Sequence, residues 1–119
     1  MFFNFKKMIK GFGYAFEGIK SAFAEETFKV FCLAAVVVFL MMFLLHVTLL
    51  EKVALIMTIM FVMTLELINS RIERILDFLQ SDHDPKIKVI KDISAGAVLI
   101  ASLGALIVGV LIFWPYLVR

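Results

Sequence analysis

The sequence has little of what usually stabilises a soluble or secreted domain of its size. Its 119 residues include one cysteine, two prolines and one tryptophan, and only 18% of them are charged. The lone Cys32 excludes an intramolecular disulfide and any paired-cysteine metal or redox motif. Because Cys32 lies in an apolar run, we interpret it as a small packing residue. The formal net charge of +2 is too small to indicate nucleic acid as a partner.

Several sequence motifs are also absent. We expect no signal peptide, because the N-terminal lysines are not followed by a continuous apolar core. The chain contains no GxxxxGKS/T or GxGxxG phosphate loop, no GxSxG nucleophile elbow and no HExxH metal helix. If this chain binds a nucleotide, its site is therefore not one of the loops that soluble enzymes use.

What the sequence does have is apolar length. Hydrophobic residues make up 63% of it and its mean hydropathy is +1.04, an excess that indicates lipid as the solvent. We expect a single domain of the all-α integral membrane class, covering residues 1–119. It should comprise a surface helix at about 1–26 and three transmembrane helices at about 28–50, 53–79 and 92–115. Pro115 should end the last helix.

The first 26 residues differ from the rest, because they combine large apolar residues with charges at helical spacing. The apolar positions recur every three or four residues: Phe5, Met8, Ile9, Phe12, Phe16, Ile19 and Phe23. Four lysines and Glu17 fall mostly on the other side. Such an amphipathic helix should lie in the membrane surface. It either anchors the chain only, or it also lends residues to a site at the surface.

Lysine and arginine indicate the orientation of the spans. Ten of the twelve lie before the first span or between the second and third, whereas Lys52 and Arg119 lie on the other side. We therefore expect the N-terminus and the second connection to be cytoplasmic. Small residues on the third span allow close helix packing, within or between chains: Ala97, Ala101, Ala105 and Gly109. Because three helices cannot easily surround a polar site, we expect a homo-oligomer.

The most informative segment lies at the end of the second span. One helix face carries its polar residues: Glu66, Asn69, Ser70, Glu73 and Asp77. At 100° per residue, the acids and the amide fall within an arc of roughly 80° along about 16 Å of helix. A carboxylate within a span costs several kcal/mol unless it is neutralised, so Glu66 is a functional candidate. A divalent cation would remove the repulsion among the three acids, and carboxylates suit Mg²⁺. In the plain alternative, Glu73 and Asp77 are solvated charges where the helix leaves the membrane, and Arg71 and Arg74 pair with acids nearby.

Two smaller polar clusters flank the other spans. One precedes the third span and consists of Lys86, Lys88, Lys91 and Asp92. Lysines are expected there from the orientation alone, whereas Asp92 is not, and its plain role is a helix cap. The other cluster, Glu25 and Glu26, begins the first span. These acids either complement the helix dipole, or one of them completes a metal site with Glu73.

These segments resemble the prokaryotic diacylglycerol kinase family, which includes undecaprenol kinases. The central motif is Glu66-Leu67-Ile68-Asn69-Ser70-Arg71-Ile72-Glu73-Arg74-Ile75-Leu76-Asp77. The second motif is Lys91-Asp92-Ile93-Ser94-Ala95-Gly96-Ala97-Val98. The N-terminal motif is matched by residues 7–14 and 18–23. The resemblance covers nearly the whole chain.

The resemblance implies a homotrimer in the bacterial inner membrane, with sites shared between subunits, that transfers a phosphoryl group from Mg-ATP to a lipid hydroxyl. It implies that Glu66 is the general base and that Asn69 helps to position the substrate. Further implied roles are metal binding by Glu73 with Glu25 or Glu26, nucleotide binding by Asp77, Lys91, Asp92, Tyr14 and Lys7, and substrate binding by Ser70 and Ala95. The chain departs from the family pattern at Arg71, where the family usually has a small residue.

Three alternatives stay open. The spacing from Gly18 selects Glu26 as the metal ligand, whereas the Glu-x-x-Phe-Lys pattern selects Glu25. The turn Asp82-His83-Asp84-Pro85 favours undecaprenol over diacylglycerol as the lipid. In a different class of function, the chain is a small oligomeric transporter with Glu66 as a proton or cation relay, or a non-catalytic membrane adaptor.

Overall fold

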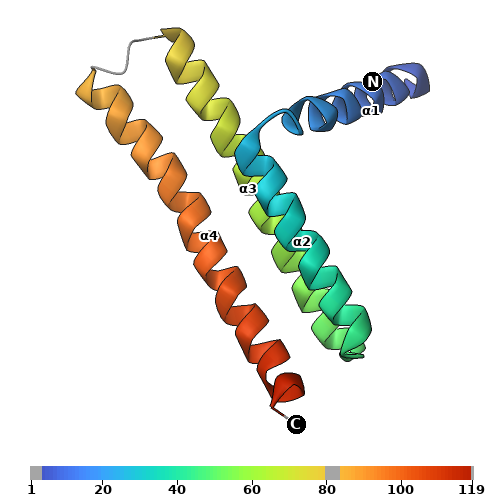
Figure 1. Cartoon of the computed structure of the whole chain (residues 1–119). Coiled ribbons are helices and arrows are strands. Elements are labelled where there is room, and N and C mark those ends of the chain that lie inside the picture. The colour runs from blue at the N-terminus through green and yellow to red at the C-terminus, as the bar shows by residue number, and fades with distance from the viewer. Residues whose placement is uncertain (1–3, 80–83, 119) are drawn as a thin grey trace.

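A computed structural model describes residues 4–79 and 84–118 and is helical through most of them. Its helices are α1 (Phe5–Ala22), α2 (Glu26–Leu44), α3 (Leu49–Leu79) and α4 (Pro85–Leu117). Helices α2, α3 and α4 are each long and apolar enough to cross a membrane. The prediction of an all-helical chain with three membrane-spanning helices is confirmed (Figure 1). The location of α1 in the membrane surface stays a prediction.

Side chains close to the helix starts explain where three of the helices begin. The Asn4 side chain accepts a hydrogen bond from the backbone N–H of Lys7 at 3.1 Å and caps α1. At the start of α3, Thr48 and Glu51 cap each other's backbone N–H groups at 2.9 and 3.2 Å, which is a capping box. Asp84 caps α4 by accepting from Lys86 N at 2.9 Å, with proline in the first turn.

The helix bounds differ from those expected at several points. Helix α2 ends at Leu44 and α3 begins at Leu49, so a short turn at His46 lies inside the apolar stretch expected to span the membrane. Helix α4 begins at Pro85 instead of near 92, because Asp84 supplies the cap that Asp92 was expected to supply. The prediction that Pro115 ends the helix is wrong, since α4 continues to Leu117. Only the last turn lies beyond this proline, so little helix is lost with the missing N–H.

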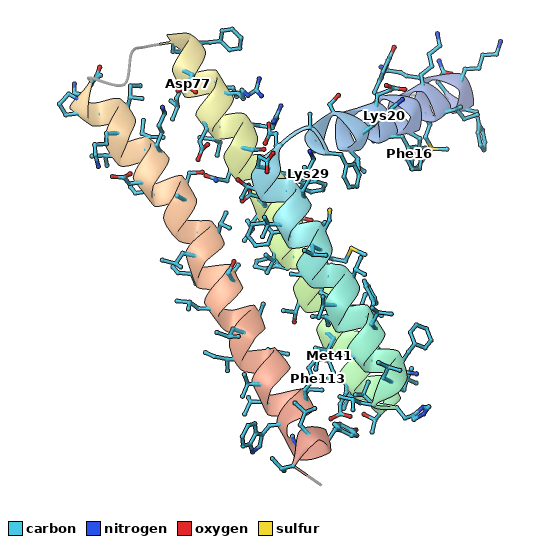
Figure 2. All side chains as sticks on the ribbon, in the orientation of Figure 1. Phe16, Lys20, Lys29, Met41, Asp77 and Phe113 are labelled. Carbon is cyan, nitrogen blue, oxygen red and sulfur yellow. The ribbon has the colours of Figure 1, made fainter. Side chains whose placement is uncertain are left out.

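Helix α3 is the centre of the chain and packs against both α4 and α2. Figure 1 shows α4 running beside α3, α2 crossing it, and α1 pointing away from α4. The hydrophobic core lies at one end, which we call the His46 end, and contains Met42, Val47, Leu55 and Phe113. Figure 2 shows Met41 and Phe113 at this end and Asp77 at the opposite end, which we call the Asp77 end.

Two side-chain contacts lie at the helix ends. At the His46 end, the Tyr116 hydroxyl donates to a Glu51 carboxylate oxygen at 2.5 Å and ties the end of α4 to the start of α3. At the junction of α1 and α2, the rings of Phe23 and Phe28 meet edge to face with centroids 5.2 Å apart. The first contact joins α4 to α3, and the second lies where the chain turns from α1 into α2.

Candidate functional site

The polar residues expected on one face lie on the uninterrupted helix α3, and their burial changes along it. Glu66 is 4% exposed, and Asn69 and Ser70 are each 8% exposed. Glu73 is exposed, and the Asp77 side chain is 56% exposed. The face therefore passes from the interior of the chain to its surface within three helical turns, as a site with one apolar and one aqueous substrate would need.

The buried Glu66 carboxylate has like charges as neighbours. The carboxylates of Glu73 and Glu25 both lie close enough to act electrostatically on Glu66. Burial of a charge is costly, and like charges add to that cost unless a cation offsets them. The three acids come from two helices, which sequence spacing on α3 alone does not indicate.

The Asn69 side chain links α3 to α4. Its Nδ2 donates to Glu73 Oε1 at 3.4 Å, and its Oδ1 accepts from the Ser94 hydroxyl on α4 at 2.7 Å. Sequence reasoning did not identify Ser94 as a site residue. The spacing from Lys91 could have identified Ser94, because residues three apart share a helix face. Both side chains contact α3.

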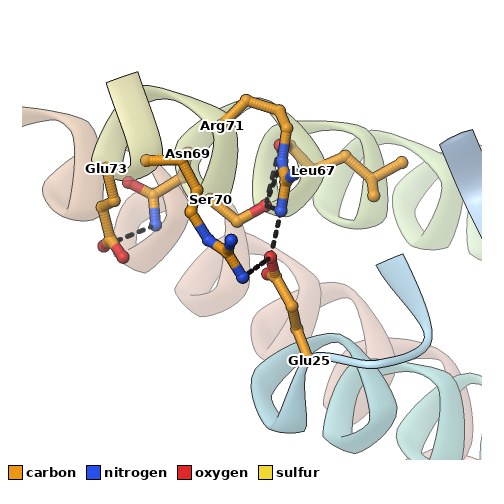
Figure 3. A network of polar contacts seen from close by, with 7 residues as sticks. Glu25, Leu67, Asn69, Ser70, Arg71 and Glu73 are labelled. Atoms are coloured by element: carbon orange, nitrogen blue, oxygen red, sulfur yellow. Dashed lines mark hydrogen bonds and ion pairs between the residues drawn. The ribbon is translucent and has the colours of Figure 1, made fainter. Parts of the chain in front are cut away.

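Glu25 reaches α3 through arginine. It is the cap residue of α2, but its side chain makes no capping hydrogen bond. Arg71 Nη2 instead donates to Glu25 Oε1, and Arg74 Nη2 lies 3.6 Å from the same oxygen (Figure 3). The acid that pairs with these arginines is Glu25, which precedes α2, and not Glu73 or Asp77 of their own helix. Glu26 is the exposed first residue of α2.

The Ser70 hydroxyl is used within α3. It donates to the backbone carbonyl of Leu67 at 3.0 Å and accepts from the Arg71 guanidinium at 3.4 Å (Figure 3). Arg71 thus bridges Ser70 and Glu25, and the residue that departs from the family pattern holds α2 against α3. The predicted role of Ser70 in substrate binding stays a prediction.

The residues expected at the nucleotide fall into two groups. Lys91 Nζ donates to Asp77 Oδ1 at 2.5 Å across the α3–α4 contact, so these two are brought together. Asp92 accepts from Lys88 at 2.7 Å along α4, and both side chains are mostly exposed. Lys7 and Tyr14 are exposed on α1, which points away from α4 in Figure 1. The five residues expected at the nucleotide therefore do not lie together within one chain.

An apolar hollow of about 340 Å³ lies between α3 and α4 beside Asn69. Its walls are formed by Leu65, Ile68, Asn69, Ile72, Ile90, Ile93, Ser94 and Ala97. Asn69 and Ser94 are its polar members, whereas Ala95, which was expected at the substrate, is exposed on α4 and is not among its walls. The apolar wall of the hollow is suited to a hydrocarbon chain, and Asn69 is suited to the polar end of the same molecule.

The acidic side chains also bear on metal binding. Within residues 4–79 and 84–118, no three acidic, histidine or cysteine side chains converge closely enough to enclose an ion. Mg²⁺ does not require such a cage, since it binds through one or two carboxylates together with substrate phosphates and water. Glu73, which is exposed, and Glu25, whose side chain is 20% exposed, are oxygen donors of that kind. The donor set therefore fits Mg²⁺ bound together with a phosphate ligand.

Comparison with known proteins adds a second line of observation. A sequence profile described as prokaryotic diacylglycerol kinase matches residues 13–113. The chain is 34% identical to the undecaprenol kinase of Bacillus subtilis, over 93% of this chain and 91% of that protein. It is 31% identical to the diacylglycerol kinase of Escherichia coli K12, over 95% and 93% respectively. It is 36% identical to the diacylglycerol kinase of Synechocystis, over 91% of this chain and 63% of that longer protein.

Proposed function

Because the chain belongs to the prokaryotic diacylglycerol kinase family, we propose that it is a lipid kinase that transfers the γ-phosphoryl group of Mg-ATP to the hydroxyl of a membrane lipid alcohol. One observation carries the proposal beyond family membership. A single helix face leads from the buried Glu66 to the exposed Asp77, so it can meet a lipid at one end and a nucleotide at the other.

Glu66 acts as the general base in this proposal. Phosphoryl transfer needs positioning and charge neutralisation more than covalent chemistry from the protein. Glu66 accepts the proton of the lipid hydroxyl, and Asn69 holds that hydroxyl close to it. The apolar hollow next to Asn69 supports this assignment, because it offers a place for hydrocarbon beside the polar end of the lipid.

The aqueous end of the face binds the nucleotide. Lys91, paired with Asp77, lies where α3 and α4 meet and supplies positive charge for phosphates, with Asp77 and Asp92 as further contacts. Glu73 with Glu25, or Glu26 in its place, holds Mg²⁺, which when bound neutralises the charge of the transferred group. Glu25 is favoured because its carboxylate reaches α3 through Arg71, whereas Glu26 is exposed at the start of α2.

A homotrimer completes the site. Lys7 and Tyr14 lie on α1, which points away from α4 in Figure 1, and a neighbouring chain can supply these α1 residues instead. The small residues of α4 support this assembly, because Ala97, Ala101, Ala105 and Gly109 recur at four-residue spacing and allow helix backbones to approach closely. In this assembly, the site faces the cytoplasm of a bacterial inner membrane, in agreement with the lysine and arginine distribution.

The lipid acceptor is an undecaprenol in preference to diacylglycerol. This preference comes from the turn at Asp82-His83-Asp84-Pro85, of which Asp82 and His83 lie outside the described residues. The relatives carry both names, undecaprenol kinase and diacylglycerol kinase, at similar identities of 34% and 31%.

A phosphorylation assay with both lipids tests the proposal. The purified chain in micelles receives γ-labelled ATP and either undecaprenol or diacylglycerol, with Mg²⁺ or with a chelator. We expect label in the lipid extract, more with undecaprenol, and none after chelation. Absence of label in both lipids would contradict the kinase proposal and favour the transporter or the adaptor. A higher rate with diacylglycerol would reverse the preferred acceptor.

A further inference from the structure

We propose that Ser94 is a positioning residue, which holds the side-chain amide of Asn69 in one orientation for phosphoryl transfer. The inference rests on the proposed function, because it assumes that Asn69 handles the lipid hydroxyl. It adds a residue from a second helix to a catalytic face that otherwise belongs to α3.

The geometry sets Ser94 apart from the other contacts of Asn69. The Ser94 hydroxyl donates to Asn69 Oδ1 at 2.7 Å, an optimal length for a hydroxyl donor. The contact from Asn69 Nδ2 to Glu73 Oε1 is 3.4 Å, which is long for a hydrogen bond. Asn69 is only 8% exposed, so water cannot readily replace a partner that it loses.

The donors and acceptors of Ser94, Asn69 and Glu73 allow only one orientation of the Asn69 amide. An ionised carboxylate can only accept, so the Glu73 side must face the Asn69 amino group. The Asn69 carbonyl oxygen then faces Ser94 and needs a donor, which the hydroxyl provides. The reversed amide would set its carbonyl oxygen against the Glu73 carboxylate. Because the Glu73 contact is long, the Ser94 hydroxyl is the stronger of the two restraints on the amide.

Other serines of the chain show that this contact is specific. Ser70 directs its hydroxyl to the Leu67 carbonyl of its own helix. Ser102 lies on α4 about 12 Å beyond Ser94, and its buried hydroxyl oxygen has no partner among the described residues. Ser102 is therefore a matched control. Ser102→Ala removes one hydroxyl oxygen from α4, as Ser94→Ala does, but it takes no contact away from Asn69.

Loss of the Ser94 hydroxyl should affect the chemical step more than binding. In Ser94→Ala, Asn69 Oδ1 loses its donor, so the amide can rotate away from the orientation that serves the lipid hydroxyl. Lys91 and Asp77, which are assigned to the nucleotide, keep their pairing. Ser94→Thr keeps the donor, and the hollow beside Ser94 has room for the added methyl group.

The test compares four proteins in nanodiscs: wild type, Ser94→Ala, Ser94→Thr and Ser102→Ala. For each, kcat and the KM values for ATP and lipid are measured, and kcat is normalised by the helical content from circular dichroism. We expect Ser94→Ala to lower kcat about five- to thirtyfold with the KM for ATP unchanged, the range expected when one buried hydrogen bond is lost. Ser94→Thr should recover most of the rate, and Ser102→Ala should match wild type.

Three outcomes would overturn the inference. Equal rates for Ser94→Ala and Ser102→Ala would show that the hydroxyl does not position Asn69. A Ser94→Thr variant as slow as Ser94→Ala would show that the hydroxyl is not the relevant group. A rise in the KM for ATP at constant kcat would place Ser94 in nucleotide binding instead. If the wild-type chain phosphorylates no lipid, the proposed function fails, and the inference fails with it.

Discussion

The polar face of α3 carries carboxylates whose chemistry is the same but whose surroundings differ. Glu66 is 4% exposed, whereas the side chain of Asp77 is 56% exposed. An exposed carboxylate is solvated by water, but a buried one must be offset by other groups. Substitutions at the buried end should therefore change the chemistry of the reaction, and those at the exposed end should change nucleotide affinity.

Glu66→Gln should abolish turnover and leave assembly and ATP binding intact. The amide keeps the size of the side chain and cannot accept the lipid proton, so we expect a loss of about 10²- to 10⁴-fold in kcat. The variant also removes repulsion from Glu73 and Glu25, so it should be at least as stable as wild type. The assay is γ-labelled ATP turnover, with Glu17→Gln, an exposed position on α1, as the control. Wild-type turnover in Glu66→Gln would refute the assigned base.

Arg71→Ala should lower the Mg²⁺ concentration that supports half-maximal activity. Arg71 neutralises Glu25, so a metal ion must compete with the guanidinium for this carboxylate. The pair is partly exposed, with 51% of the arginine side chain accessible, so its loss is worth about 0.5–1 kcal/mol, or roughly a two- to fivefold shift. The readouts are a Mg²⁺ titration of activity and Mn²⁺ binding measured by electron paramagnetic resonance.

Arg74→Ala is the matched control for Arg71→Ala. Arg74 lies 3.6 Å from Glu25 and its side chain is 64% exposed, so we expect a smaller shift in the Mg²⁺ requirement. A higher Mg²⁺ requirement in Arg71→Ala would show that Arg71 supports the metal site and does not compete with it.

At the scale of whole helices, the α2–α3 turn lies inside the apolar stretch that hydropathy assigns to a single span. Helix α2 ends with Leu45 as its cap, and His46 follows with φ of 52°, in the left-handed region. Helix C-termini commonly end in this way, with glycine as the usual residue. Histidine there bears a conformational cost that glycine would not. The α2–α3 turn thus has a histidine at a position whose positive φ favours glycine.

His46→Gly should stabilise the chain by roughly 0.5–1 kcal/mol, because relief of a side chain at positive φ outweighs the entropy that glycine adds to the unfolded state. Thermal unfolding in one detergent, followed by circular dichroism, measures the effect. His46→Ala keeps a Cβ and should give no gain. A lower midpoint for His46→Gly than for wild type would contradict the assigned turn.

For the whole molecule, a single chain leaves parts of the proposed site apart. The residues on α1 are distant from the α3–α4 contact in Figure 1, and an apolar hollow of about 470 Å³ remains beside Ala105 and Gly109. Apolar surface in a membrane can face lipid, so the hollow does not itself require a partner. The proposed partner chain is suggested instead by the division of the residues proposed to bind the nucleotide, which lie on α1 and on the α3–α4 pair.

Gly109→Leu should dissociate the proposed trimer and preserve the helices. A Cβ at Gly109 meets nothing within 4 Å in one chain, whereas a leucine side chain would block a helix packed against the small residues. Chemical cross-linking in nanodiscs should give a species of three 13.5 kDa chains for wild type and mostly monomer for the variant. Gly11→Leu, on α1, is the control. A monomeric wild type, or an intact trimer in Gly109→Leu, would contradict this prediction.

Much of this arrangement could be predicted from local properties of the sequence. Apolar length predicted the three long helices, and the spacing of Glu66, Asn69 and Glu73 predicted a common face on α3. The family was also correctly identified from its motifs. The start of α4 was missed, because hydropathy marks where a helix becomes apolar and the cap at Asp84 marks where it begins. The roles assigned to the individual site residues stay predictions.

Local sequence specifies which segments are helical and which side chains share a face, because a helix repeats every 3.6 residues whatever surrounds it. The partners across helices follow from the packed fold and not from any one segment: Ser94 with Asn69, Arg71 with Glu25, and Lys91 with Asp77. These pairs depend on how far each helix is rotated and shifted against its neighbour. That rotation is set by the packing of all the side chains between the helices, and no local stretch of sequence contains it.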